Sequence, residues 1–285
     1  MIQYYGIAAA AVTMFSLQFW FNDRFQKHCG SSARAAVVFS LGANLAGLVT
    51  LLVINRFQLE FTPFSAIMAL LVGLDGILFL YCSLKAFAVI NLSLYSVFSM
   101  LGGMALPFAL GLTVYGEPLT WGKALCFVFT AAALALTVKK EKNSRKAWLY
   151  YAGIFVLNGM SGVLSKIFQA TDLPKTSAAG FSVLSAAAGV LLSAAVLPFI
   201  RGEKVKLALR PSLDMTAYGA VNRAANFLLL IALEHLPASA QYPFVTGGVM
   251  ILSTLICFFT PQKPTKRELL AVALAFVGLV LLVAV

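Results

Sequence analysis

The sequence predicts an all-α membrane protein of ten transmembrane helices, arranged as two inverted repeats of five helices each. Three observations lead to this prediction: an apolar composition, ten apolar segments of helical length, and a pattern that recurs on either side of a basic linker. Of the 285 residues, 61% are hydrophobic and 11% are charged, whereas soluble domains carry about 25% charged residues. So many apolar side chains cannot cover a surface in water without aggregation, and a bilayer is the expected environment.

The ten segments are each close to the ~20 residues that a helix needs to cross a hydrocarbon core of ~30 Å. Backbone groups in lipid must pair internally, so we expect helices, and no segment shows the alternation of a β-barrel strand. No basic residue precedes the first segment, so we expect a helix there and no secretory signal. To within a few residues the segments are 2–22, 33–55, 64–90, 92–115, 119–138, 147–168, 176–200, 212–236, 238–260 and 266–285.

The basic linker "KKEKNSRK", residues 139–146, separates a first repeat, 1–138, from a second, 147–285. A shift of 146 positions superimposes the segment boundaries without a gap. It also matches residues that set backbone shape: Gly73 with Gly219, Gly102 with Gly248, and Pro118 with Pro264. Because each repeat has an odd number of segments, the second must enter the membrane from the opposite side. Inverted repeats are typical of secondary transporters, whose substrate site lies between the halves near the midplane.

The basic residues are distributed unevenly between the two sides of the membrane. Of 21 Lys and Arg residues, 15 lie at connections that follow odd-numbered segments. The positive-inside rule places these connections in the cytoplasm and both termini outside. This topology also accounts for the net charge of +11, so a nucleic-acid partner is not expected. The four cysteines are scattered and form neither a disulfide framework nor a metal-ligand spacing, and we expect no metal or cofactor.

Two stretches resemble a known transporter family. "GEPLTWGKALCFVFTAAALALTV", 116–138, is similar to the end of a repeat in the drug/metabolite transporter superfamily. "ALEHLPASAQYPFVTGGVM", 232–250, resembles the junction of the third and fourth helices of that repeat, and EamA-type permeases are the most similar branch. The second repeat departs from the pattern, because it has "TPQKPTK" where the first has "YGEPLT". The resemblance implies cytoplasmic termini, opposite to the charge distribution, and the orientation stays open.

Four charged residues lie within apolar segments: Asp75, Lys85, Lys166 and Arg223. A charge at the centre of a bilayer costs ~3 kcal/mol on insertion scales, so it is expected to face a cavity or a partner. Asp75 and Arg223 each lie about eleven residues inside equivalent segments, near the midplane. We therefore expect them to meet across the axis between the repeats, either as a structural pair or as a substrate site. Lys85 and Lys166 lie closer to helix ends, and we expect both to snorkel to the interface.

Polar residues near Arg223 extend the predicted cavity. Asn222, Arg223 and Asn226 share one helical face, and the repeat alignment places Tyr95 opposite Gln241. Pro107 and Pro243 are expected to interrupt their helices and to bare carbonyl groups toward the cavity. Further candidates for the cavity wall are Lys85, Trp20, Tyr81 and Tyr242, and Trp20 and Tyr81 are equally typical of an interfacial aromatic belt.

An enzymatic function is not expected. "GMSG", 159–162, resembles the serine motif of rhomboid-like intramembrane proteases, but a serine nucleophile needs a base within hydrogen-bond reach. The two histidines, His28 and His235, lie at or beyond helix ends, far in depth from Ser161. The sequence has neither a phosphate-binding Walker loop nor a zinc-binding His-Glu-x-x-His motif.

The sequence as a whole predicts a multi-pass transporter in the cell (inner or plasma) membrane, working as a single chain. Its substrate would be a small polar or zwitterionic metabolite, with Arg223, Asn222 and Asn226 holding an anionic group. Asp75 would bind an amine or carry a coupling proton. One alternative is a carrier or flippase for phosphorylated or lipid-linked sugars. An alternative outside transport is a membrane scaffold or sensor, whose helices would pack without a cavity.

Overall fold

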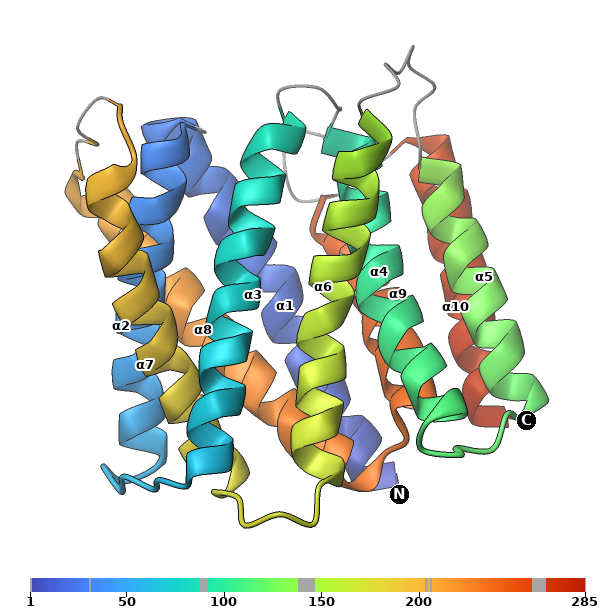
Figure 1. Ribbon diagram of the computed structural model, residues 1–285. Coiled ribbons are helices and arrows are strands. Elements are labelled where there is room, and N and C mark those ends of the chain that lie inside the picture. The colour runs from blue at the N-terminus through green and yellow to red at the C-terminus, as the bar shows by residue number, and fades with distance from the viewer. Residues whose placement is uncertain are drawn as a thin grey trace.

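A computed structural model of the chain consists of ten α-helices and one short 3-10 helix in its described part (Figure 1). The described residues are 2–30, 32–87, 92–137, 147–202, 205, 207–257 and 265–284, and within the helices a few side chains, chiefly in 80–87 and 92–98, are not described. The helices are α1 (Ile2–Cys29), α2 (Ala33–Ile54), α3 (Pro63–Phe87), α4 (Leu92–Thr113), α5 (Trp121–Thr137), α6 (Ala147–Ala170), α7 (Ala178–Val196), η1 (Leu197–Phe199), α8 (Leu209–His235), α9 (Ala238–Cys257) and α10 (Lys266–Ala284).

Ten helices were predicted, and the described part of the chain contains ten α-helices, with two notable differences in length. Helix α1 continues seven residues beyond its predicted end at residue 22. In this extension Phe25 is buried, and Arg24 pairs with the buried carboxylate of Asp214 at 3.2 Å. Helix α8 begins at Leu209, so Pro211 lies in its first turn. Proline is tolerated there because the N–H groups of the first turn have no acceptor within the helix.

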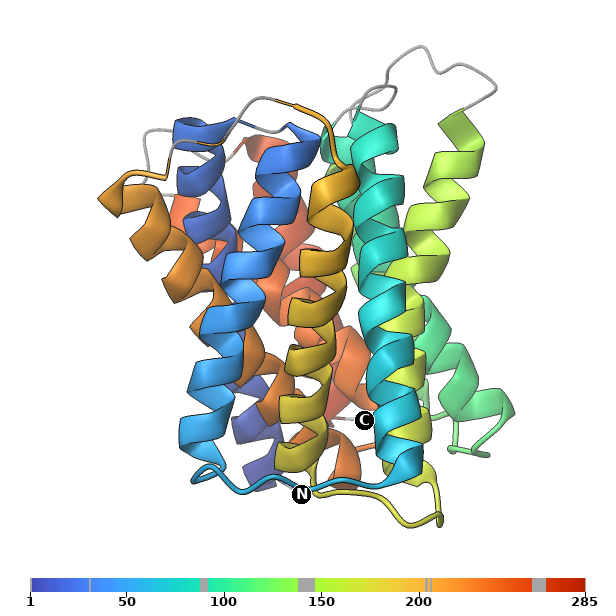
Figure 2. The same ribbon diagram turned by 60° about the vertical axis from the view of Figure 1, so that its left-hand side comes forward.

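Eight helices form a closed ring, in which each packs against two neighbours. The order around the ring is α2, α8, α1, α9, α4, α6, α3 and α7, and back to α2. Helices α5 and α10 stand outside the ring, packed against each other and against α4 and α9, at one side of the molecule in Figure 1. Helices α3 and α8 are therefore not ring neighbours, and neither are α1 and α6. The turned view in Figure 2 shows the same upright arrangement from another side.

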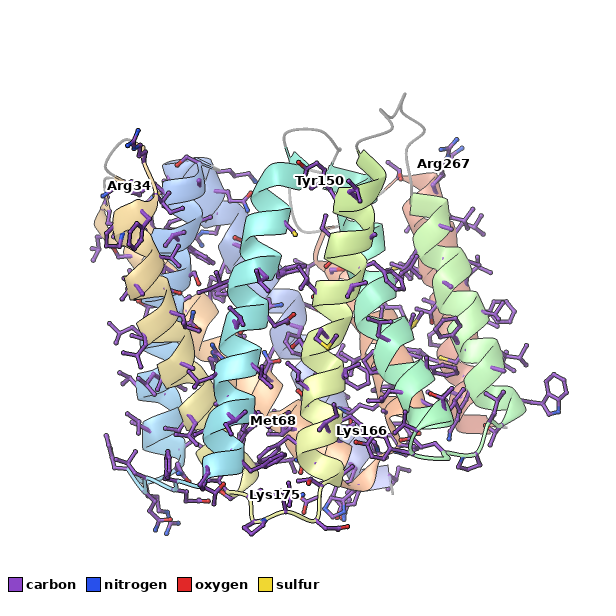
Figure 3. All side chains as sticks on the ribbon, in the orientation of Figure 1. Arg34, Met68, Tyr150, Lys166, Lys175 and Arg267 are labelled. Carbon is purple, nitrogen blue, oxygen red and sulfur yellow. The ribbon has the colours of Figure 1, made fainter. Side chains whose placement is uncertain are left out.

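The two ends of the bundle differ in charge. Odd-numbered helices end at the upper face of Figure 1 and even-numbered helices end at the lower face, where both chain termini are marked. We call these the basic face and the terminal face. Arg34 and Arg267 lie at the basic face and Lys166 and Lys175 near the terminal face, as labelled in Figure 3. Successive described helices thus run in opposite directions, as the predicted charge asymmetry requires.

Glycines allow the ring helices to approach closely. A Cβ atom on Gly219 of α8 would lie 2.0 Å from the carbonyl oxygen of Ala43 in α2. A Cβ atom on Gly102 of α4 would lie 1.9 Å from the carbonyl oxygen of Phe155 in α6. Both contacts require glycine, because real Cβ atoms do not approach a backbone oxygen so closely, and small residues at helix crossings are typical of membrane bundles.

The expected interruptions at Pro107 and Pro243 are wrong. Helices α4 and α9 continue through these residues, and both prolines are buried in the bundle. Each proline removes one backbone hydrogen bond, but close packing holds the chain on both sides of it. The ring of Pro107, for example, lies against Gly162 of α6, where a Cβ atom would be only 2.4 Å away.

Three helical stretches of the described chain are long and apolar enough to cross a membrane: Ala33–Ile54, Ala178–Phe199 and Leu209–His235. The outer surface of α2 agrees with an apolar environment. Leu45, Val49 and Val53 follow one another at intervals of one turn, and each is more than half exposed. An apolar stripe of this kind on the outside of a helix bundle indicates a membrane protein.

Candidate ligand-binding site

Two adjoining chambers lie inside the ring. The smaller has a volume of about 250 Å³ and the larger about 710 Å³. The chambers adjoin along a set of residues that line both: Phe79, Asn158, Ser161, Ser165, Asn222, Asn226 and Leu230. Five of these seven side chains are polar, so the space between the chambers is lined by hydrogen-bonding groups. Ligand sites of this size combine apolar walls with a few placed polar groups.

Arg223 and Asp75, the two charges predicted at the midplane, both line the smaller chamber. Asp75 lies twelve residues after the start of α3, and Arg223 twelve residues before the end of α8. At 1.5 Å per residue each is about 18 Å from the terminal face. Both side chains therefore lie at similar depth along one chamber.

The guanidinium of Arg223 is held by a neutral partner. It donates a hydrogen bond to Oδ1 of Asn44 in α2. The Asn44 amide in turn donates to the carbonyl oxygen of Ser40 at 2.8 Å. Gly47 and Gly189 leave room for the arginine, because Cβ atoms there would lie 2.2 Å from Cγ and 3.0 Å from Nη2 of Arg223. Asn44 fixes the guanidinium without neutralising its charge.

Asp75 does not pair with Arg223, so the structural pair, one of the two alternatives for these charges, is not formed. Both side chains are described, and the ion pairs among the described residues are Arg24 with Asp214 and Lys166 with Glu117. Asp75 is 7% exposed, and its Oδ1 atom has no hydrogen-bond partner in the described chain. The physical reason is the ring order, since α3 packs against α6 and α7 while α8 packs against α1 and α2. Two opposite charges therefore face one small chamber without neutralising each other.

Asn222 and Asn226 line both chambers, as predicted. The Asn222 amide donates to Oε1 of Gln18 in α1, and the Asn226 amide donates to the backbone oxygen of Asn222 at 2.8 Å. The side-chain oxygen of Asn222 lies 3.4 Å from the Asn226 amide. Asn222 thus joins α8 to the wall that α1 provides.

The remaining predicted residues have different surroundings. Tyr242 lines the larger chamber and donates to the backbone oxygen of Gly162 at 3.0 Å. Gln241 is fully buried, donates to the backbone oxygen of Leu229 at 2.9 Å, and is not part of either lining. Trp20 is 40% exposed beneath the guanidinium of Arg24 and also stands outside both linings. The side chains of Tyr81, Lys85 and Tyr95 lie outside the described residues.

Several lining residues were not singled out from the sequence. Asn158 of α6 lines both chambers and donates to the backbone oxygen of Ser99 at 2.6 Å. Ser161, whose role as a protease nucleophile was rejected above, is also part of the wall. The available signal was the presence of polar side chains at helical spacing in apolar runs, as for Asn158, Ser161 and Ser165. Asn44 in "GANLAG" gave a similar signal between two glycines.

Lys166 does not extend to the interface as a lone charge. Its Nζ atom lies 2.8 Å from Oε1 of Glu117, and the two side chains are 12% and 8% exposed. Glu117 also accepts hydrogen bonds from Ser239 and from the backbone N–H of Ala238, at the start of α9. The expected snorkelling of Lys166 is therefore wrong, because the connection between α4 and α5 brings a carboxylate to it.

Comparison with known proteins shows the fold. No protein-family model matches the chain, and no curated protein matches it. Twenty-nine chains of solved structures match. One, described as "Crystal structure of protein", aligns with 99% of this chain and 96% of its own length, at a TM-score of 0.79 and 14% sequence identity. The arrangement of all ten helices, including the ring, thus has a counterpart in a crystal structure.

Proposed function

We propose that this chain is a secondary transporter of the drug/metabolite type, similar to EamA permeases, that moves a small zwitterionic metabolite. It would span the cell membrane ten times, and its two inverted repeats would alternate access to the central chambers. The proposal rests chiefly on one observation: Arg223 and Asp75 carry opposite charges into one 250 Å³ chamber without contacting each other. A zwitterion would satisfy both, with its carboxylate on Arg223 and its amine on Asp75.

The ring order supports the inverted repeats. Replacing each helix by its equivalent in the other repeat exchanges α1 with α6, α2 with α7, α3 with α8 and α4 with α9. The same ring results, because α2–α7 and α4–α9 are converted into themselves and every other neighbouring pair into another neighbouring pair. The outer pair α5 and α10 is converted into itself. Such exchange is expected of two copies of one bundle related by a twofold axis in the membrane plane.

The alternative of a packed scaffold or sensor has less support. Its helices would close the centre of the bundle, and the two charges would pair directly, which the described side chains do not do. A carrier of phosphorylated sugars would favour a cluster of basic residues, whereas Arg223 is the single lysine or arginine among the described lining residues. One guanidinium balances the single charge of a carboxylate, whereas a phosphate monoester carries about −1.5 to −2 at pH 7.

Binding and transport are tested in two steps with purified full-length protein. The standard amino acids are screened by thermal shift, because a ligand that binds the folded form raises its apparent stability. The best stabiliser is then used radiolabelled in proteoliposome counterflow. We expect Arg223→Ala to abolish counterflow and Arg201→Ala, which changes an exposed arginine, to retain it. Full flux in Arg223→Ala, with the ligand still binding, would remove Arg223 from the mechanism.

A further inference from the structure

The connection between α4 and α5 belongs to the first half of the chain and contacts the second half at the terminal face. Gly116 adopts a left-handed conformation with φ of 60°, which glycine tolerates best. The Glu117 N–H donates to the backbone oxygen of Gly111 at 2.9 Å, and a Cβ atom at Gly111 would lie 2.5 Å from the Glu117 carboxylate. The "GEP" turn therefore folds the glutamate back beneath α4 and aims it into the bundle.

In the described chain, the ion-pair and hydrogen-bond partners of the Glu117 carboxylate come from the other half of the sequence. Lys166 of α6 forms the ion pair, and Oε1 accepts from the N–H of Ala238 at 2.9 Å. Oε2 accepts from the N–H of Ser239 at 2.9 Å and from its hydroxyl at 2.6 Å. One carboxylate thus caps the positive end of α9 and neutralises a buried lysine. Charge-assisted hydrogen bonds of this kind are the strongest available to a protein.

Other contacts close the same face. Glu60, between α2 and α3, accepts from the N–H and hydroxyl of Ser177 at 2.6 Å, at the start of α7. Gln169 donates to the backbone oxygen of Leu230 at 2.6 Å. This last bond joins α6 to α8, which are not ring neighbours, so the two sides of the ring meet here. The equivalent helices at the basic face, α1 and α3, make no contact of comparable extent in the described part of the chain.

The repeat alignment places lysines at the positions equivalent to these two glutamates. The positions 146 residues after Glu60 and Glu117 are Lys206 and Lys263. A lysine ammonium has donors only and cannot accept a hydrogen bond from a helix N-terminus, where a positive charge is also unfavourable. Both lysines lie outside the described residues, so the comparison is of sequence alone. One face carries two glutamates at the positions where the other carries two lysines.

We propose that Glu117, Lys166 and the N-terminus of α9 form a latch that holds the terminal face closed. The inference rests on the proposed alternating access. Opening the terminal face separates the two repeats, so every bond of the latch crosses the moving boundary. At the basic face the ion pair of Arg24 with Asp214 crosses the same boundary. Breaking the latch should therefore shift the population toward the state that is open at the terminal face.

The test measures which face admits a water-soluble reagent to the cavity. The four native cysteines are replaced by serine, and Ser165→Cys is introduced, because Ser165 lines both chambers near the end of α6. An impermeant maleimide is applied to each side of oriented proteoliposomes. Gln58→Cys, in the exposed connection between α2 and α3, identifies the terminal face in a parallel sample.

We expect Glu117→Gln to raise the labelling rate from the terminal face about tenfold, equivalent to about 1.4 kcal/mol between the two states. Glu234→Gln is the matched control, because it changes an exposed glutamate at the same face, and it should label like the parent. Since Glu117→Gln leaves Lys166 buried without its partner, the double variant E117Q/K166M is measured as well and should show the same rise. The charge exchange E117K/K166E restores an ion pair but not the α9 cap, so labelling should remain fast.

Labelling at the parental rate in E117Q/K166M, with the protein still monodisperse and cooperatively melting, would overturn the latch. Slow labelling in the charge exchange would show that the ion pair alone closes the face and would also overturn the role of the α9 cap. The assay contains no substrate, so it gives a result whether or not a zwitterion binds. A failed counterflow experiment with an intact labelling response would reject the proposed substrate and leave the latch standing.

Discussion

Gly189→Ala changes the position of Arg223 without changing any charge. In α7, a Cβ atom at residue 189 would lie 2.8 Å from Oδ1 of Asn44 and 3.0 Å from Nη2 of Arg223. Ordinary contacts begin near 3.4 Å, so these atoms must retreat by about half an ångström, the scale at which a placed binding group loses its geometry. Both are ends of side chains, so we expect the helices to stay in place and the Asn44–Arg223 hydrogen bond to give way.

The size of the effect follows from the bond that is lost. A hydrogen bond to a charged group contributes about 1.5–3 kcal/mol, which corresponds to a rise in Kd of roughly ten- to hundredfold. Gly76→Ala is the matched control, because Gly76 lines the same chamber and a Cβ atom there would meet nothing within 4 Å. The assay is isothermal titration of the purified protein with the amino acid selected by thermal shift. Unchanged affinity in Gly189→Ala, or equal losses in both variants, would refute the assigned role of Arg223.

Three further predictions concern the charges, the helix seam and the latch. Asp75→Asn should abolish the thermal shift caused by amino acids but spare any caused by carboxylates without an amine; equal losses for both ligand classes would contradict the amine site. Gly219→Ala places a Cβ atom 2.0 Å from the Ala43 carbonyl oxygen, so the free energy of unfolding should fall by about 1–3 kcal/mol, and an unchanged melting temperature would contradict that close contact. Burial raises the pKa of Glu117, but hydrogen bonds from Lys166 and the start of α9 outweigh this effect and hold it below its usual 4.5. The latch should therefore be fully formed above pH 4.5 and lost only as the pH falls through the lowered pKa, so labelling from the terminal face that rises between pH 8 and 6 would contradict it.

The helices were predictable because composition and length alone define them. An apolar run of about 20 residues between polar connections permits little else in lipid, and the run 33–55 became Ala33–Ile54. The polar face of α8 was equally readable, since three polar residues at helical spacing in an apolar segment must share a cavity or a partner. Arg223, Asn222 and Asn226 do line the same chamber.

The partners of these residues were not predictable, because depth in the membrane says nothing about position around the ring. Asp75 and Arg223 lie at the same depth, but α3 and α8 are separated by the chamber. The second limit on prediction was the direction in which each side chain points around its helix. Gln241 and Tyr242 are adjacent in sequence, yet a rotation of about 100° per residue turns the tyrosine toward the cavity and the glutamine toward the backbone of α8.

The Lys166 ion pair was hidden for a different reason. Its partner Glu117 belongs to a short connection in the other half of the chain, and the left-handed Gly116 decides where that carboxylate points. The sequence showed the Gly-Glu pair and its absence from the second repeat, but not the fold of the turn. Loop geometry and contacts between the halves are therefore what the structure adds.

The most direct test of the account is an experimental structure of the protein with the stabilising amino acid bound. We predict ligand density in the smaller chamber, with the carboxylate within hydrogen-bond distance of Arg223 and the amine within hydrogen-bond distance of Asp75. Density elsewhere, or a ligand-free structure in which the aspartate and the arginine close onto each other and the chamber disappears, would contradict the zwitterion site.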